Sequence, residues 1–209
     1  MPDVGDLVAP AHTAVLTMEC QRGIIGDLSA FGELRDAAEA GGVLTNGPSV
    51  VAAARAAGVR VVHCTAERRE DGAGSVANCR MLAGAQAMHE QGGGIDQGTP
   101  GAQLVAEFGP APADIVVPRL HGLTPFTATS LDQTLRNLGV TTVVAVGVSL
   151  NIGVLGLTLS AVDLGYQAVV VTDAVAGVPL EYGEQLLGGT FGLLATLITT
   201  ENLIAAWAP

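Results

Sequence analysis

The sequence predicts an α/β protein with three layers, in which helices cover both faces of a mostly parallel, doubly wound sheet of about six strands. Short valine-rich runs alternate along the chain with longer segments that favour helix, and glycines close several of these segments. Strands that alternate with helices are joined by crossovers, so they run parallel in one sheet. With 209 residues and no internal repeat, the chain is expected to form a single domain, residues 1–209.

Six apolar segments are expected to be the strands of this sheet. The strongest is TVVAVG, whose residues are apolar on both sides of the strand and therefore suit the centre of a parallel sheet. The third is expected to stop at Pro118, because proline has no N–H for a central strand. In order, the expected strands are Thr13 to Met18, Val59 to Cys64, Ile115 to Val117, Thr142 to Gly147, Gln167 to Thr172 and Leu197 to Thr199.

Helices are expected between these strands. Asn46 is a candidate cap for a helix near Pro48 to Ala57 that Gly58 closes. Thr65 to Asp96 is charged and rich in glycine, which predicts a long irregular excursion with one short helix around Val76 to His89. Other helices are expected within Thr99 to Phe108, at Thr129 to Leu138, at about Ile152 to Leu164 with Ser149 or Asn151 as its cap, and at Glu181 to Ala195.

Charge and cysteine content exclude several classes of function. The formal net charge is -11, and the nine basic residues are all arginine, so no basic patch predicts a nucleic-acid partner. Glycines and polar residues interrupt the uncharged stretch from Val140 to Val162, so a strand followed by a helix explains it better than a membrane span. Three cysteines without CxxC spacing, and an N-terminus without a signal sequence, predict free thiols and a cytoplasmic protein.

Polar residues follow three of the expected strands, and the carboxyl ends of parallel strands meet at one edge of a sheet. Glu19 follows the first strand, Arg119 to His121 follow the third, and Ser149 to Gly153 lead from the central strand into the next helix. The N-terminus of that helix adds free N–H groups and a partial positive charge. Ligands bind at such edges, so this edge is the predicted site for a small-molecule substrate.

Five segments of the chain carry a resemblance to a known family. The chain resembles the isochorismatase-like, or cysteine hydrolase, family over nearly its whole length, which implies a Rossmann-like fold and a hydrolase. The segments are TAVLTMECQRG at Thr13 to Gly23, VVHCTAERR at Val61 to Arg69, DIVVPRLHGLTPFTATSL at Asp114 to Leu131, LRNLGVTTVVAVGVSLNIGVLGLTLSAVDLGY at Leu135 to Tyr166, and VVVTDAVAG at Val169 to Gly177.

The resemblance implies a catalytic set of aspartate, lysine and cysteine, and this chain departs from it. Glu19 stands at the aspartate position and Gly153 at the cysteine position, so no thiol can attack from there. The chain has no lysine; Arg119 is the nearest cation, although an offset of one residue would place Leu120 or Pro118 at that position. A branch of the family that hydrolyses vinyl ethers also looks to have glycine in place of the cysteine.

Our leading hypothesis is therefore a hydrolase or lyase in which Glu19 is the general acid or base and faces a space left free at Gly153. Arg119 completes the catalytic set, and the resemblance implies that Phe126 lines the pocket. The alternatives are a non-catalytic protein of this fold that binds a ligand or assembles, and a cofactor-free tailoring enzyme of natural-product synthesis. The other residues expected to bind substrate are Gln21, His121, Ser149 and Asn151.

Further expectations concern metals, the backbone and assembly. Some relatives bind a metal through an Asp-x-His pattern, but Glu67 and Arg69 occupy the matching positions, and arginine is not a metal ligand. We therefore expect no metal and no cofactor. The resemblance also implies a cis peptide between Val148 and Ser149, and a homodimer or larger homo-oligomer. Cys64 is expected to be an inert core residue, because His63 points to the opposite face of its strand.

Overall fold

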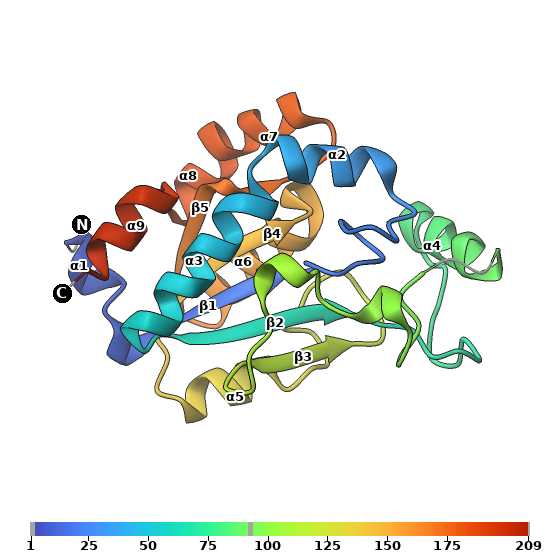
Figure 1. Cartoon of the computed structure of the whole chain (residues 1–209), viewed down its shortest axis with the longest axis horizontal. Coiled ribbons are helices and arrows are strands. Elements are labelled where there is room, and N and C mark those ends of the chain that lie inside the picture. The colour runs from blue at the N-terminus through green and yellow to red at the C-terminus, as the bar shows by residue number, and fades with distance from the viewer. Residues whose placement is uncertain (1–2, 92–93, 209) are drawn as a thin grey trace.

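A single sheet of six parallel strands organises the chain in the computed structural model, which describes residues 3–91 and 94–208. The strand order is β3-β2-β1-β4-β5-β6, so the connections run outward from β1 in one direction and from β4 in the other. The predicted α/β fold class is confirmed (Figure 1). The strands are β1 (Thr13–Met18), β2 (Arg60–Ala66), β3 (Ile115–Arg119), β4 (Thr142–Val148), β5 (Gln167–Ala176) and β6 (Thr196–Ile198).

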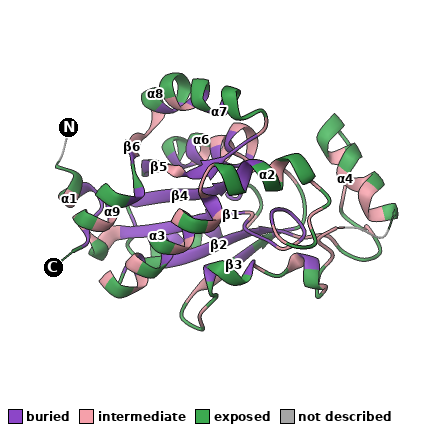
Figure 2. Cartoon of the chain, turned by 45° about the horizontal axis from the view of Figure 1, so that its top comes forward, coloured by how far each residue is buried: buried purple, intermediate pink, exposed green. Residues whose placement is uncertain are grey.

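Alternate residues of the central strands face two separate hydrophobic cores. In β1, Val15 belongs to one core and Leu16 to the other, as the two-residue repeat of a strand requires. One core lies under α2 (Gly32–Ala40), α3 (Val43–Ala57) and α9 (Thr200–Ala206). The other lies under α5 (Leu131–Asn137), α6 (Leu155–Asp163) and α7 (Leu180–Leu186). The central strands β1 and β4 are buried on both faces (Figure 2), which explains why their sequences are apolar without alternation.

The third strand is longer than expected. It passes through Pro118 and ends at Arg119, which is paired with Ala66 of β2. Proline is tolerated here because β3 lies at the edge of the sheet and needs no donor on its free side. Arg119 is therefore the last residue of a strand and not part of a loop, which fixes its position relative to β2.

Several helix boundaries also differ from the expectation. α3 begins at Val43, so Asn46 lies inside the helix; its Nδ2 donates to the carbonyl of Asp173 at 2.6 Å, and the prediction that it caps the helix was wrong. The central helix begins with a π-helical turn, Leu150–Val154. Ser149 precedes that turn but makes no capping bond with its side chain to the described residues, so this prediction was wrong as well. The peptide between Val148 and Ser149 is cis, as the resemblance implied.

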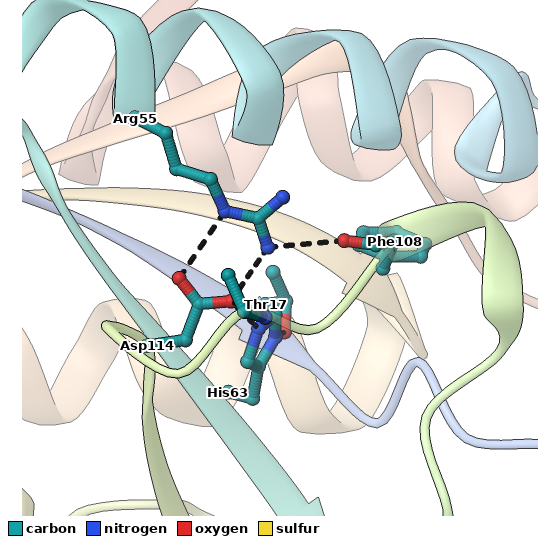
Figure 3. Close-up of polar contacts among 6 residues, drawn as sticks. Thr17, Arg55, His63, Phe108 and Asp114 are labelled. Atoms are coloured by element: carbon teal, nitrogen blue, oxygen red, sulfur yellow. Dashed lines mark hydrogen bonds and ion pairs between the residues drawn. The ribbon is translucent and has the colours of Figure 1, made fainter.

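A buried polar network connects β1, β2 and α3 to the loop before β3 (Figure 3). His63 is fully buried; its Nδ1 lies 2.8 Å from Oγ1 of Thr17, and its Nε2 lies 3.2 Å from Oδ2 of Asp114. Arg55 donates to Asp114 through both Nε and Nη2, and Nη2 also donates to the carbonyl of Phe108. His63 thus faces away from Cys64, as its position in the strand predicted.

Burial and hydrogen bonds shift the pKa values of this network in a consistent way. Burial lowers the pKa of His63, and the bond to Asp114, which acts in the opposite direction, does not offset it. Burial alone raises the pKa of Asp114, but the hydrogen bonds that it accepts from Arg55, the Ala111 backbone and His63 together bring it below its usual value. The network therefore consists of a neutral histidine beside an ionised carboxylate and its arginine.

Candidate active site

A cavity of about 240 Å³ lies at the carboxyl ends of β1, β2 and β3 and beside the start of the central helix. The tips of these strands point towards α4 (Arg80–Glu90), which stands at the far side of the cavity (Figure 1). Five of the predicted site residues line this cavity: Glu19, Arg119, His121, Ser149 and Gly153. Residues that belong to three strand ends far apart in the sequence thus meet at the edge of the sheet at which we expected the site.

Glu19 and Arg119 form a buried ion pair in this cavity. Nη2 of Arg119 donates to Oε1 of Glu19, and the two side chains are 7% and 15% exposed, respectively. Nε of Arg119 donates to the carbonyl of Gly122 at 3.0 Å, whereas its buried Nη1 has no hydrogen-bond partner among the described residues. Arg119 therefore holds the carboxylate of Glu19 in place, and its Nη1 is left as a donor without a partner among the described residues.

The backbone at Glu19, a residue that lines the cavity, has a strained conformation. Its φ is 54°, in the left-handed region that non-glycine residues rarely adopt. The backbone is held there by two bonds, from Glu19 N to the carbonyl of Cys64 and from Gln21 N to the carbonyl of Glu19. Such strain costs on the order of 1–3 kcal/mol and is found most often at functional sites.

Gly153 lines the cavity together with Glu19, but the space immediately around its Cα is narrow. A Cβ atom built on Gly153 would lie 2.9 Å from Cε of Met18 and 3.1 Å from the carbonyl oxygen of Val148. Met18 is fully buried and directly precedes Glu19. Glu19 and Gly153 therefore share the cavity, but a side chain at position 153 would have to displace the end of the Met18 side chain.

We expect the Gly153→Cys variant to be less stable than the wild type by about 1–3 kcal/mol, because the new Cβ lies 3.1 Å from the carbonyl oxygen of Val148 and displaces the end of the buried Met18 side chain. Shortening Met18 to alanine makes room for the thiol. In a double-mutant cycle measured by urea unfolding, Met18→Ala and Gly153→Cys should thus cost less together than the sum of their separate costs. Strictly additive costs would show that Met18 does not restrict position 153.

Gln21 is placed differently from the prediction that it binds substrate. It is fully buried, and its side-chain amide is hydrogen-bonded to backbone groups. Nε2 donates to the carbonyls of Ala66 and Ala102, and Oε1 accepts from Ala66 N at 2.7 Å. It is absent from the described cavity lining. Gln21 connects the end of β2 to the loop at residue 102, so it supports the site from behind.

Phe126 and Asn151 also lie outside the described lining of the cavity. Phe126 is buried and packs against Tyr166, with ring centroids 5.9 Å apart. Nδ2 of Asn151 donates to the carbonyl of Val178 at 3.2 Å, which connects the π-helical turn to the segment before α7. Both side chains therefore have structural contacts in place of the predicted contact with substrate.

None of the three cysteines belongs to the described lining of the cavity. Burial raises the pKa of Cys20 well above its usual value and that of Cys64 to about 12; near Cys64, Arg119 lowers the pKa and Glu19 raises it, both by less than burial does. Cys79 is exposed and precedes α4, outside the described cavity lining. Buried thiols with raised pKa values are poor nucleophiles, because the thiolate is the reactive form.

The wall of the cavity opposite the strand ends is formed by α4, and it was not predicted from the sequence. Met81, Leu82, Ala85 and Met88 of α4 line the cavity. The signal was present in the sequence, because these residues recur at the spacing of one helix face within an otherwise charged and glycine-rich excursion. Within residues 3–91 and 94–208, no group of three His, Cys, Asp or Glu side chains is arranged to hold a metal ion, and no helix could span a bilayer.

Comparison with known proteins agrees with the fold and the resemblance. The model of the isochorismatase domain family matches residues 13–202. An uncharacterised isochorismatase family protein, YwoC of Bacillus subtilis, is 32% identical over 66% of this chain and 75% of its own. The ureidoacrylate amidohydrolase RutB of Agrobacterium fabrum is 29% identical, with 96% of this chain and 93% of the relative covered.

Solved structures match the whole architecture. A cysteine hydrolase from Pseudomonas syringae pv. phaseolicola superposes with a TM-score of 0.81 at 20% identity, covering 96% of this chain and 94% of the other. An isochorismatase family protein from Desulfovibrio vulgaris also gives 0.81, at 26% identity, covering 95% and 100%. N-carbamoylsarcosine amidase from Thermoplasma acidophilum gives 0.70 at 22% identity, covering 91% and 97%.

Proposed function

The chain belongs to the isochorismatase family, and on that premise we propose that it is a hydrolase of a small metabolite that works without a cysteine nucleophile. Relatives named ureidoacrylate amidohydrolase support hydrolysis as the reaction class. The observation that carries the mechanism is the Glu19–Arg119 pair on the wall of the cavity. In our proposal, Glu19, Arg119 and Gly153 take the positions of the family's aspartate, lysine and cysteine.

Glu19 serves as a general base in this mechanism. Arg119 donates to its carboxylate and so orients Glu19 on the wall of the cavity, where a carboxylate oxygen can accept a proton. It takes a proton from water as the water oxygen attacks the carbonyl carbon, and it returns that proton to the leaving nitrogen or oxygen when the bond breaks. Vinyl-ether hydrolysis needs the same residue as an acid in its first step, whereas attack by water on a carbonyl group needs it as a proton acceptor, which is the role we propose.

The remaining groups position the substrate. Nη1 of Arg119 is a donor without a partner in the described chain, and it suits an oxygen that gains negative charge during attack. His121 and Ser149 line the same cavity and are the remaining candidates for polar contacts with substrate. The proposal includes no metal or cofactor; assembly into homo-oligomers and a cytoplasmic location remain predictions.

One observation favours a second candidate, a non-catalytic ligand-binding protein of the same fold. Met18 narrows the space for a side chain at position 153, and Glu19 is already paired with Arg119. A binding protein would keep the cavity but lose turnover. A cofactor-free tailoring enzyme is a third possibility, and it would use the same acid–base pair on another substrate.

The test of the proposal is a hydrolysis screen of amides, esters and enol ethers before and after treatment with iodoacetamide. We expect turnover of at least one class, with incorporation of ¹⁸O from labelled water, and less than a two-fold change after alkylation of the exposed Cys79. Inactivation that a Cys79→Ser variant prevents would instead identify a cysteine enzyme. Tight binding of a probe from the screen without turnover of any class would favour the ligand-binding alternative.

A further inference from the structure

α4 presents an apolar face that the protein itself leaves uncovered. None of its residues is buried, and none belongs to either hydrophobic core. Figure 2 shows the helix at the margin of the molecule, half-buried on one side only. Its side chains at positions 81, 82, 85 and 88 nevertheless line the cavity, together with Ile24, Phe31, Leu34, Ile95, Leu120, Leu123 and Ile152 from the opposite walls.

The charged groups of the cavity do not favour an anion. Glu19 neutralises Arg119, and Glu67 adds a second carboxylate whose oxygens accept from Thr65 and Gln97. Asp96 is the third; its Oδ1 lies 2.9 Å from Nδ1 of His89, close enough for an ion pair but not aligned for a hydrogen bond. Arg68 is the second cation in the described lining, so positive charge does not exceed negative charge.

Two arginines of the cavity each have a buried donor without a partner among the described residues, Nε of Arg68 and Nη1 of Arg119, and the second of these lies beside Glu19. Arg119 is 7% exposed, and its Nη1 is buried with no acceptor among the described residues, although Nε and Nη2 are both bonded. A buried donor without an acceptor is costly, which indicates that a ligand supplies one. Because the charge of Arg119 is already balanced by Glu19, a neutral carbonyl oxygen is sufficient.

We propose that the substrate is an uncharged carboxamide or ester with an apolar body about the size of a phenyl ring. Its carbonyl oxygen accepts from Nη1 of Arg119, which places the carbonyl carbon near Glu19. Its body lies in the cavity against the apolar face of α4. This assignment of substrate class rests on the proposed function, and it explains why an amphipathic helix stands over the site without contributing to the core.

Calorimetry on the wild-type protein compares the affinities of three probes: phenylacetamide, acetamide and phenylacetate. The comparison shows how much the apolar body and the neutral head group each contribute to binding. We expect phenylacetamide to bind at least ten-fold more tightly than acetamide, which lacks the body, and than phenylacetate, which replaces the neutral head by an anion. Phenylacetate affinity equal to or above that of phenylacetamide would overturn the assignment. So would the absence of binding by both phenylacetamide and 4-phenylbutanamide at millimolar concentration.

Variants then locate the apolar body. Leu82→Ser should weaken phenylacetamide at least five-fold and leave the melting temperature within a few degrees, because Leu82 lies outside the cores. Leu159→Ser is the matched control; Leu159 is a 44% exposed leucine of α6 outside the described lining, and its replacement should not change the affinity. An unchanged affinity for Leu82→Ser, with a change of oligomeric state in light scattering, would make the α4 face a subunit interface.

The binding experiment also distinguishes this inference from the proposed function. Tight binding of phenylacetamide without hydrolysis contradicts the hydrolase proposal but supports the ligand class. Hydrolysis of small or anionic substrates, with no preference for an apolar body, supports the hydrolase and contradicts the ligand class.

Discussion

Replacing Glu19 with glutamine is expected to lower kcat by about 10²–10⁴-fold, the range that general acid–base catalysis contributes. The amide keeps an oxygen that can accept from Nη2 of Arg119, so the cavity and the fold should be retained. What the amide cannot do is take a proton from water. The measurement is steady-state kinetics on a substrate found in the hydrolysis screen, with circular dichroism and thermal unfolding to show that the variant is folded.

Glu67 supplies the matched control for this experiment. It is the other glutamate in the described lining of the cavity, and within the described residues it makes hydrogen bonds with Gln97 and Thr65 but no ion pair. Glu67→Gln should therefore change kcat by less than ten-fold. If the two variants lost activity equally, the carboxylates would act through the charge of the cavity and not through proton transfer at Glu19. Full activity of Glu19→Gln would remove Glu19 from the mechanism.

The strands were more predictable from sequence than the helices, for a physical reason. A strand buried on both faces must be apolar throughout, and this made β1 and β4 visible as continuous runs. α2 was missed, because its apolar residues are mainly small alanines among charged ones. α3 was started too late, because Pro48 resembles a first-turn residue although it lies inside the helix.

The candidate site was predictable to the level of position but not of contact. Strand order places the ends of β1, β3 and β4 at one edge, so Glu19, Arg119 and Gly153 could be expected to meet. Whether a polar side chain faces the cavity or the backbone depends on packing with distant segments. Gln21 donates to the carbonyl of residue 102, and the end of the Met18 side chain lies close to Gly153; neither contact leaves a local pattern in the sequence.

Replacing Asp114 with asparagine is expected to destabilise the protein by about 3 kcal/mol at neutral pH. Asp114 is 4% exposed and accepts hydrogen bonds from Arg55, His63 and the Ala111 backbone. The amide leaves a guanidinium without its counter-ion and turns an N–H group towards other donors, and breaking one partner of a buried pair is strongly destabilising. Urea unfolding of the variant and the wild type at pH 7 measures the difference directly.

The pH dependence and a surface control make this prediction specific to the buried network. Because the folded pKa of Asp114 is lowered, its contribution is present above about pH 4 and is lost as pH falls through the folded pKa. The difference between wild type and variant should therefore shrink in acid. Asp36→Asn, which breaks an ion pair with Arg35 between side chains 69% and 46% exposed, should cost at most about 0.5 kcal/mol. Equal costs for Asp114→Asn and Asp36→Asn would mean that the network in Figure 3 does not hold β1, β2 and α3 together.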